Sequence, residues 1–308
     1  MRIEVWADTV CPWAYIGKRR LERALADPAL AGLDTQVVWR PYRIDPTAPA
    51  QAVPAEDTAA PGHPVQIAAE EEGLGPGWGA AWRASSHDAH RLAALAYEHG
   101  GSSLQCDVVE RVMKAHFLEG ADISDQQLLQ AIADTAGLPS NPAPLELDAA
   151  EHAVRELLLI GKARGIATSP TLVVGDRALA GAQPPEAIID FLTAAADVHT
   201  RETPEEVLRL RWAESLLRQR DPLGALTFLR PLLDRHGDDP NVRGLAARAY
   251  FHSAQLSRAH DVLRQLVADT PDDSYARLML GRTLQRLGRE QEAAVHLKTA
   301  AAMTPEFG

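Results

Sequence analysis

Cysteine is scarce in this sequence. Only two of the 308 residues are cysteines, Cys11 and Cys106. So few thiols argue against a scaffold held by disulfide bonds and against a zinc site built from cysteines. Such sparse cysteine usage is also typical of proteins from a reducing compartment, and we therefore expect a cytoplasmic protein.

Long apolar runs and basic segments are also missing. Residues 1–30 contain no apolar stretch followed by a small-residue cleavage site, and no run reaches the about 20 residues needed to cross a bilayer. The net charge is −11: residues 1–200 hold 15 basic and 27 acidic residues, whereas residues 201–308 hold 16 and 15. We therefore expect neither nucleic-acid nor membrane partners, and the change in charge near residue 200 predicts a domain boundary.

The first residues predict a strand that leads into a helix. Residues 3–7 alternate between the two faces of a strand, and apolar residues recur at helical spacing over residues 12–26. Cys11 stands directly before Pro12, and proline is well tolerated at the first position of a helix. Because the free N–H groups at a helix start stabilise a thiolate, this pattern predicts a nucleophilic cysteine. An inert, buried cysteine is the alternative.

The stretch from Asp8 to Arg20, DTVCPWAYIGKRR, resembles the opening of the DsbA-like thioredoxin family. The similarity is to the branch with polyketide-cluster and 2-hydroxychromene-2-carboxylate isomerase-like relatives. Residues 87–92, 119–124 and 165–183 resemble the same family in the same order. The resemblance implies an α/β thioredoxin-like fold over residues 1–200, with an inserted helical lid domain at about residues 80–165 that covers the active site.

One position departs from the family pattern. The family's oxidoreductases carry Cys-Pro-Trp-Cys, whereas Ala14 occupies the fourth position here. Exchange through two cysteines of this motif is therefore impossible. The resemblance implies catalytic roles for four residues: Cys11, Pro12, Trp13 and Pro170.

The resemblance also implies how a substrate is held. The family has a cis proline where this chain has Ser169-Pro170, and the backbone beside it can pair with an extended substrate. Candidate contacts to the substrate or to a thiol cofactor are Ser169, Thr171, Tyr15, His87, His90 and Arg91. Tyr15 is equally compatible with the core. His87 and His90 lack further ligands that would make a metal site, so none is predicted.

A single reactive cysteine suggests a monothiol cycle. Cys11 would attack a disulfide, and a small thiol such as glutathione or mycothiol would resolve the mixed disulfide, with no tightly bound cofactor. Cys106 would replace that thiol if the lid brought it close enough. The main hypothesis is therefore a thiol-disulfide oxidoreductase that acts on a small thiol or disulfide substrate.

Two other functions remain open. In the isomerase-like branch the first motif position is usually serine and bound glutathione does the chemistry, so a glutathione-dependent isomerase or transferase is one alternative. The other is a redox-inactive chaperone or interaction adaptor. In that case Cys11 would be dispensable, and the C-terminal region would recruit the partner.

The remaining patterns predict the elements of residues 1–200. Residues 35–42 predict a second strand, ended by Pro41, and the proline-rich residues 44–78 predict a long surface excursion without periodicity. Helices are expected over residues 90–97, 108–117, 124–136 and 147–163. A β-hairpin (171–174 and 178–182) and a helix (184–196) are expected to follow.

Residues 203–308 repeat with a period of 34. The recurring residues are Ala225, Ala259 and Ala293; Leu229, Leu263 and Leu297; and Pro271 and Pro305. This is the tetratricopeptide period, in which small residues allow helices to pack closely. We therefore predict an all-α domain of three tetratricopeptide-like repeats after a linker at residues 197–201.

The first helices of such repeats line a concave groove. Arg248, Arg282 and Arg286 are predicted to face it, and a basic groove would suit an acidic peptide or a C-terminal carboxylate. A solvated helix face explains the same arginines equally well. The repeats would bind a protein partner or hold the chain in a homodimer.

Overall fold

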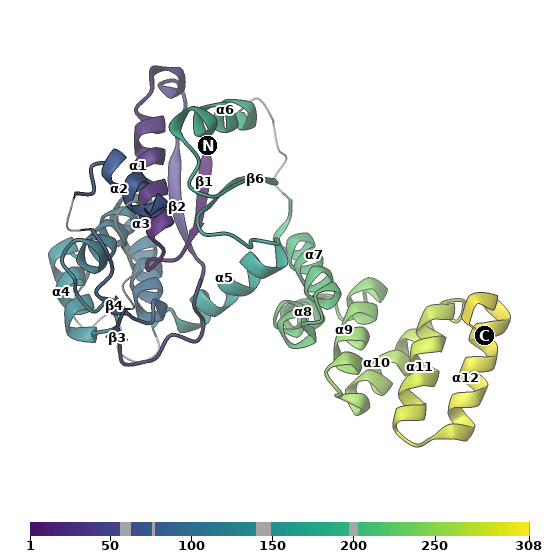
Figure 1. The fold of residues 1–308 in the computed structure, drawn as a ribbon. Helices are drawn as coiled ribbons and strands as arrows, with labels where there is room; N and C mark the ends of the chain where they lie inside the picture. Colours follow the sequence, from purple (N-terminus) through teal and green to yellow (C-terminus); the bar gives the residue numbers. More distant parts are fainter. Residues whose placement is uncertain (56–62, 76–77, 140–148, 197–202, 308) are drawn as a thin grey trace. The chain divides into compact units, whose positions relative to one another are not determined.

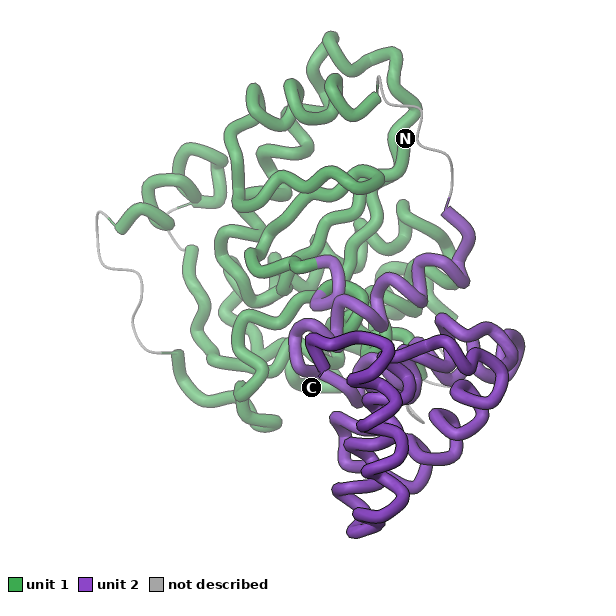
Figure 2. The backbone as a smooth tube through the Cα atoms, turned by 90° about the vertical axis from the view of Figure 1, so that its right-hand side faces the viewer, with its two compact units in different colours: residues 1–161, 165–200 green, residues 162–164, 201–308 purple. Residues whose placement is uncertain are grey.

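The computed structural model describes residues 1–55, 63–75, 78–139, 149–196 and 203–307. The chain divides into two compact units (Figure 2), residues 1–161 with 165–200, and residues 162–164 with 201–308. The predicted linker at residues 197–201 lies outside the described residues.

The first unit is built on a mixed sheet of four strands in the order β2-β1-β5-β6 (Figure 1). The strands are β1 (Arg2–Ala7), β2 (Gln36–Pro41), β5 (Thr171–Val174) and β6 (Arg177–Ala180). β1 runs parallel to β2 and antiparallel to β5, which forms a hairpin with β6. The predicted strands and the thioredoxin-like fold class are thereby confirmed.

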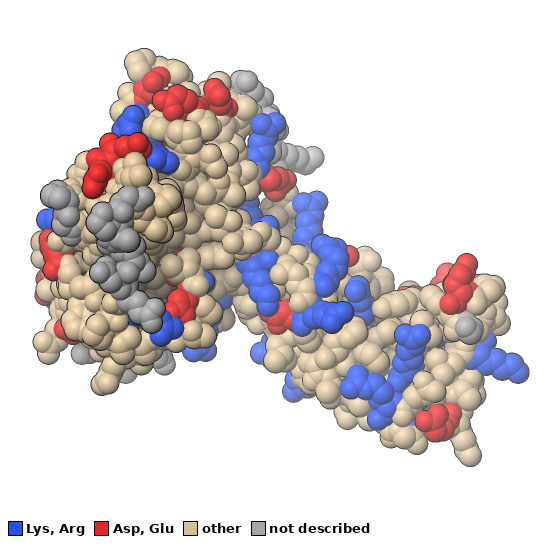
Figure 3. Space-filling model, in the orientation of Figure 1, with Lys and Arg blue, Asp and Glu red and all other residues tan. Residues whose placement is uncertain are grey.

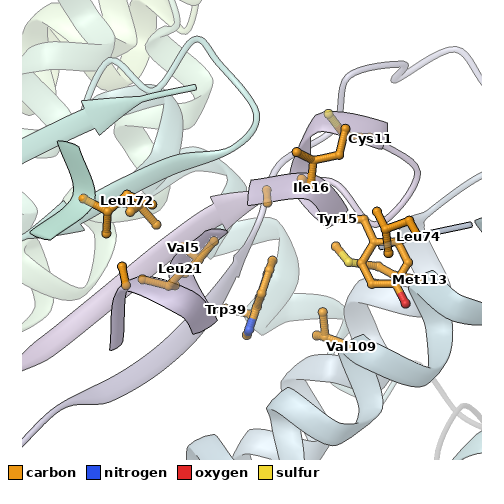
Figure 4. Close-up of a cluster of buried hydrophobic side chains, with 14 of the residues drawn as sticks. Val5, Cys11, Tyr15, Ile16, Leu21, Trp39, Leu74, Val109, Met113 and Leu172 are labelled. Atoms are coloured by element: carbon orange, nitrogen blue, oxygen red, sulfur yellow. The ribbon is translucent and has the colours of Figure 1, made fainter. Parts of the chain in front are cut away.

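Burial explains why β1 is central. Val5 lies opposite Trp39 on one side and Leu172 on the other, and all three side chains are buried. The apolar cluster in Figure 4 continues from the sheet into α1 (Pro12–Leu25) and the helical insertion, through residues such as Ile16 and Met113. Helix α6 (Pro185–Ala196) packs against α1. Cys11 lies at the edge of this core.

The helical insertion lies between β2 and β5, as the sequence predicts. It contains α3 (His87–Phe117), α4 (Gln126–Ala136) and α5 (Glu151–Ala163). Gly100 and Gly101 have non-helical backbone angles, so α3 consists of two helical segments across a kink. This kink accounts for the two separate helices that the pattern predicts over residues 90–97 and 108–117.

The proline-rich excursion is more ordered than expected. It contains α2 (Pro64–Glu71) and the short strand β3 (Val53–Pro54), which pairs with β4 (Trp82–Arg83). His63 caps α2 with its side chain, and Pro64 occupies the first turn. The sequence shows no periodicity here because one helix of eight residues and a two-residue strand are too short to produce it.

The second unit contains six helices in its described part. They are α7 (Glu205–Arg218), α8 (Pro222–His236), α9 (Pro240–His252), α10 (Leu256–Asp269), α11 (Ser274–Arg286) and α12 (Glu290–Met303). They pack as consecutive pairs, and the repeating alanines Ala225, Ala259 and Ala293 are fully buried. The predicted all-α repeat domain is confirmed.

Candidate active site around Cys11

Cys11 occupies the position directly before α1. Its backbone is extended (φ −87°, ψ 117°), and Pro12 is the first helical residue. The Cys11 N–H donates to the carbonyl of Asp8 at 3.0 Å, which closes the turn between β1 and α1. The cysteine is only 5% exposed. The sequence pattern thus places the sulfur at a helix start, as predicted.

The loop before β5 lies directly against this sulfur. The Cys11 thiol donates to the Ser169 carbonyl, with Sγ 3.4 Å from the oxygen. The Ser169–Pro170 peptide bond is cis, as the family resemblance implies. A Cβ atom on Gly17 would lie 2.8 Å from Cγ of Pro170, so the glycine allows this loop to approach α1 closely. Cys11, Ser169 and Pro170 therefore form one site.

Burial opposes ionisation of this cysteine. It is the main reason that the pKa of the Cys11 thiol is raised, and the negative charge of Asp8 acts in the same direction. The Ser169 side chain and the backbone N–H groups of Trp13 and Ala14 act in the opposite direction without reversing the shift. The direction is opposite to the lowered pKa that the helix position predicts. The site holds Cys11 as a thiol.

Asp8 is a residue beside Cys11 that the sequence reasoning did not single out as part of the site. Its side chain is almost fully buried, and Oδ1 lies 3.4 Å from Nε2 of His90, while Oδ2 accepts the Ile44 N–H at 2.7 Å. Burial alone would raise the pKa of Asp8, but His90, Ser86 and the Ile44 N–H together hold it below its usual value. The Asp8 N–H donates to Oγ of Ser169 at 3.0 Å. Asp8 therefore contacts both the turn that carries Cys11 and the loop that carries Ser169.

A pocket of about 700 Å³ borders the site, and both neighbours of Cys11, Val10 and Pro12, contribute to its wall. Trp78 and Phe117 form an aromatic stack in the wall, with ring centroids 4.7 Å apart. This volume suits a small organic molecule.

The structure brings none of the six predicted contact residues to this pocket wall. Tyr15 is fully buried in the core and donates to Glu110 at 2.9 Å. His90 supports Asp8 and lies 2.9 Å from the Tyr42 carbonyl oxygen. His90 also lines a separate pocket of about 380 Å³ between the sheet, α3 and α5.

His87 and Arg91 contact Glu151 at the start of α5, with His87 Nε2 2.6 Å from its carboxylate. Arg91 also donates to the Ala149 carbonyl and pairs with Asp88. These contacts fasten α3 to the beginning of α5.

Trp13 and Thr171 flank the site without entering the pocket wall. Trp13 is half-buried against the apolar cluster of β1 and α1. Thr171 is buried, and its hydroxyl donates to the Thr168 carbonyl at 2.7 Å. This bond fastens the turn that carries Ser169 and Pro170.

Cys106 lies in a different environment from Cys11. Both thiols are free. The Cys106 sulfur lies 3.8 Å from the Val37 carbonyl oxygen, and the positive charge of Lys18 acts on its pKa. Lys18 is seven residues beyond Cys11, which is about 10 Å along a helix. The two sulfurs therefore face different neighbours.

The three arginines predicted to face the repeat groove lie in three different environments. Arg248 lines a pocket of about 360 Å³ formed by the described helices α7, α9, α10 and α11, together with Asn241 and Tyr275. Arg286 instead donates to the Phe251 carbonyl at 2.9 Å and lies over the Phe251 ring. Arg282 is exposed and outside the pocket wall. Figure 3 shows Lys and Arg side chains spread over the repeat unit on the face in view.

The described residues contain no cluster of three or more His, Cys, Asp or Glu side chains suited to a metal ion. In the same part of the chain, no helix combines the length and apolarity that a membrane span requires.

The chain belongs to the DSBA-like thioredoxin domain family, whose sequence profile matches residues 2–193. A tetratricopeptide repeat profile matches residues 216–282. Members of the first family are oxidoreductases or isomerases. Fold and sequence therefore agree on a DsbA-like domain followed by helical repeats.

Individual relatives match about three fifths to two thirds of the chain. The uncharacterized protein YwbO of Bacillus subtilis is 26% identical over 59% of this chain and 90% of its own length. The crystal structure of a probable DsbA oxidoreductase from Streptomyces coelicolor is 28% identical, with a TM-score of 0.54 over 66% of this chain and 93% of that one. A cytosolic disulfide reductase from Pseudomonas aeruginosa, solved with GSH, is 18% identical, with a TM-score of 0.46 over 64% and 100%.

Proposed function

We propose that the protein is a cytoplasmic thiol-disulfide oxidoreductase that works through Cys11 alone. The proposal rests on one observation: a single sulfur at the start of α1 contacts the Ser169 carbonyl and is flanked by two residues of a large pocket. Ala14, at the position of the missing second cysteine, is completely buried. Membership of the DSBA-like family supports the reaction class.

The cycle has two exchange steps. Cys11 loses its proton and attacks one sulfur of a disulfide, so that a Cys11 mixed disulfide forms and the other sulfur leaves as a thiolate. A small thiol, glutathione or mycothiol, then attacks the mixed disulfide and releases Cys11. One turn of these two steps consumes one small thiol, releases one half of the substrate as a thiol, and releases the other half as a mixed disulfide with the small thiol, which a second small thiol reduces. The raised pKa of Cys11 makes the first step faster as the pH rises.

We also propose that the repeats recruit a protein partner with an acidic segment. Tetratricopeptide repeats generally mediate protein interactions, and Arg248 supplies a cation in the wall of the repeat pocket. An exchange domain tethered to a binding domain would act preferentially near that partner.

The test is to add oxidised glutathione to the Cys106→Ser protein and follow the mass of the chain. We expect one glutathione adduct at Cys11, its release by reduced glutathione, and no adduct in the Cys11→Ser, Cys106→Ser double variant. The matched Cys11→Ser single variant shows whether Cys106 reacts by itself. An unreactive Cys11 from neutral to alkaline pH would overturn the proposal.

A second function is favoured by the protonated state of Cys11. A thiol that donates a hydrogen bond can hold the sulfur of bound glutathione, as a serine hydroxyl can, so a glutathione-dependent isomerase is the second candidate. The Cys11→Ser variant separates the two functions. It keeps the donor and should retain isomerase activity, whereas it loses the nucleophile and with it all exchange.

A further inference from the structure

The pocket beside Cys11 has its charges already paired. Asp45 and Arg83, both in its wall, form an ion pair at 2.6 Å. Trp82 Nε1 donates to the Gly120 carbonyl at 3.0 Å. The wall therefore offers no unpaired charge among its described residues, and an ion would be costly to bury there.

Two further polar side chains of the wall are also engaged in hydrogen bonds. Nδ1 of His63 accepts the Val65 N–H, and the Gln66 side chain donates to Glu70. His116 is different: it is only 1% exposed, and its Nδ1 has no hydrogen-bond partner. A buried polar atom without a partner is unusual in a folded protein.

The protonation state of His116 defines what that nitrogen offers. Burial lowers the pKa of His116 to about 4, so the ring is neutral at physiological pH. The Ala121 backbone acts against this lowering, as a carbonyl facing a ring N–H does, and since Nδ1 is unpartnered we assign the ring proton to Nε2. A neutral imidazole protonated at Nε2 carries a lone pair on Nδ1. The unpartnered atom is therefore an acceptor.

We propose that this pocket binds a neutral, largely apolar small molecule that carries a hydrogen-bond donor, and that Nδ1 of His116 accepts this donor. The stacked rings of Trp78 and Phe117 supply the apolar surface. The paired state of Asp45 and Arg83 disfavours an anionic ligand. An acceptor that the protein leaves unpaired favours a ligand that pairs it over one that does not.

This inference assigns a substrate class to the proposed exchange reaction, and to that extent it rests on the proposed function. A ligand in the pocket touches the neighbours of Cys11, Val10 and Pro12. The disulfide that Cys11 attacks would then carry a neutral apolar group. Glutathione, which is anionic, would serve only as the resolving thiol.

Three flat probes of similar size test the proposal by fluorescence titration of the full chain. They are 2-naphthol, which carries a donor, 2-methoxynaphthalene, which lacks it, and 2-naphthoate, which is an anion. We expect 2-naphthol to bind about tenfold more tightly than 2-methoxynaphthalene, because loss of one buried hydrogen bond has that order of effect. 2-Naphthoate should bind most weakly of the three.

Variants then assign the contact. His116→Phe should bind the two neutral probes equally, His116→Gln should restore part of the preference through its amide oxygen, and the exposed control His152→Phe should behave as the wild type. Equal binding of the neutral probes by the wild type, or tightest binding of 2-naphthoate, would overturn the proposal without any variant. The glutathione-adduct test on the protein that keeps Cys11 separates the two failures: preferred binding of 2-naphthol without any adduct at Cys11 would refute the proposed reaction and leave the pocket standing. Repeating the titration with Cys11→Ser shows that probe binding does not depend on the thiol.

Discussion

The carboxylate of Asp8 lies 3.4 Å from Nε2 of His90, and both side chains are more than nine-tenths buried. The Asp8 carboxylate is thereby held close enough to Cys11 to act on its thiol. The same residue binds Ser169 through its backbone N–H. Asp8 therefore connects the insertion helix α3, the nucleophile turn and the loop opposite it.

The charge of Asp8 should control when Cys11 ionises. Asp8→Asn removes a negative charge that disfavours the thiolate, so the pKa of Cys11 falls and its alkylation profile moves to lower pH. The measurement is the rate of iodoacetamide alkylation against pH in the Cys106→Ser background. Asp107→Asn, which changes a carboxylate paired with Arg111 near the surface, is the matched control. A profile that stays in place or moves upward would show that the charge of Asp8 has no such role.

Gly17 should be intolerant of even a methyl group. The Cβ of alanine would lie 2.8 Å from the Pro170 ring, and a ring in a packed loop cannot move aside easily. We expect Gly17→Ala to lower the free energy of unfolding by about 1–3 kcal/mol. Urea unfolding of the Cys106→Ser protein, followed by exposure of Cys11 to alkylation, provides the measurement.

Gly244→Ala is the control for this substitution. Gly244 is also helical, but a Cβ there meets nothing within 4 Å. The higher helix propensity of alanine should stabilise α9 by about 0.5–1 kcal/mol, and thermal unfolding of the variant is the measurement. If Gly17→Ala were equally stabilising, the close packing of Pro170 on α1 would be refuted.

His116 should make the first unit sensitive to acid. Its pKa of about 4 in the folded protein is below the ordinary value of 6.5, so the unfolded chain takes up the proton more readily. This difference in pKa contributes about 3 kcal/mol to the free energy of unfolding. The contribution is complete above pH 6.5 and is lost as the pH falls toward 4. His116→Phe should flatten this part of the stability profile, whereas His152→Phe should not. Parallel profiles for wild type and His116→Phe would contradict the assignment.

The local elements were predictable because their signals are local. Pro12 and the apolar stripe after it indicate α1, and Gly175-Asp176 marks the β5–β6 turn. The 34-residue period indicates the repeats, because alanine recurs at this spacing where two helices pack closely. The fold class also followed from the motif around Cys11. Each of these features depends on neighbours in sequence or on a regular spacing.

The chemistry of the site depends on residues that are distant in sequence. The sequence indicates the helix position of Cys11, which favours a thiolate, but it does not indicate the burial that outweighs this effect. His90 was expected to face a ligand, yet it contacts Asp8, which is 82 residues earlier. Asp8 stood within the recognised motif, but no pattern marks His116, whose unpartnered nitrogen appears only in three dimensions.

The repeat arginines should separate into a binding residue and a packing residue. Arg248 lines the repeat pocket, and its Nε has no hydrogen-bond partner, so this nitrogen is not committed to another element of the repeats. Arg248→Ala should weaken binding of a short acidic peptide about tenfold or more with little change in Tm, because hydrogen bonds to charged groups have that order of effect. Arg286 instead joins α11 to Phe251 of α9, so Arg286→Ala should lower the Tm of the repeats and leave peptide affinity nearly unchanged at low temperature. Calorimetry measures both quantities on the same samples, and a peptide affinity that depends on Arg286 but not on Arg248 would place the binding surface elsewhere on the repeats.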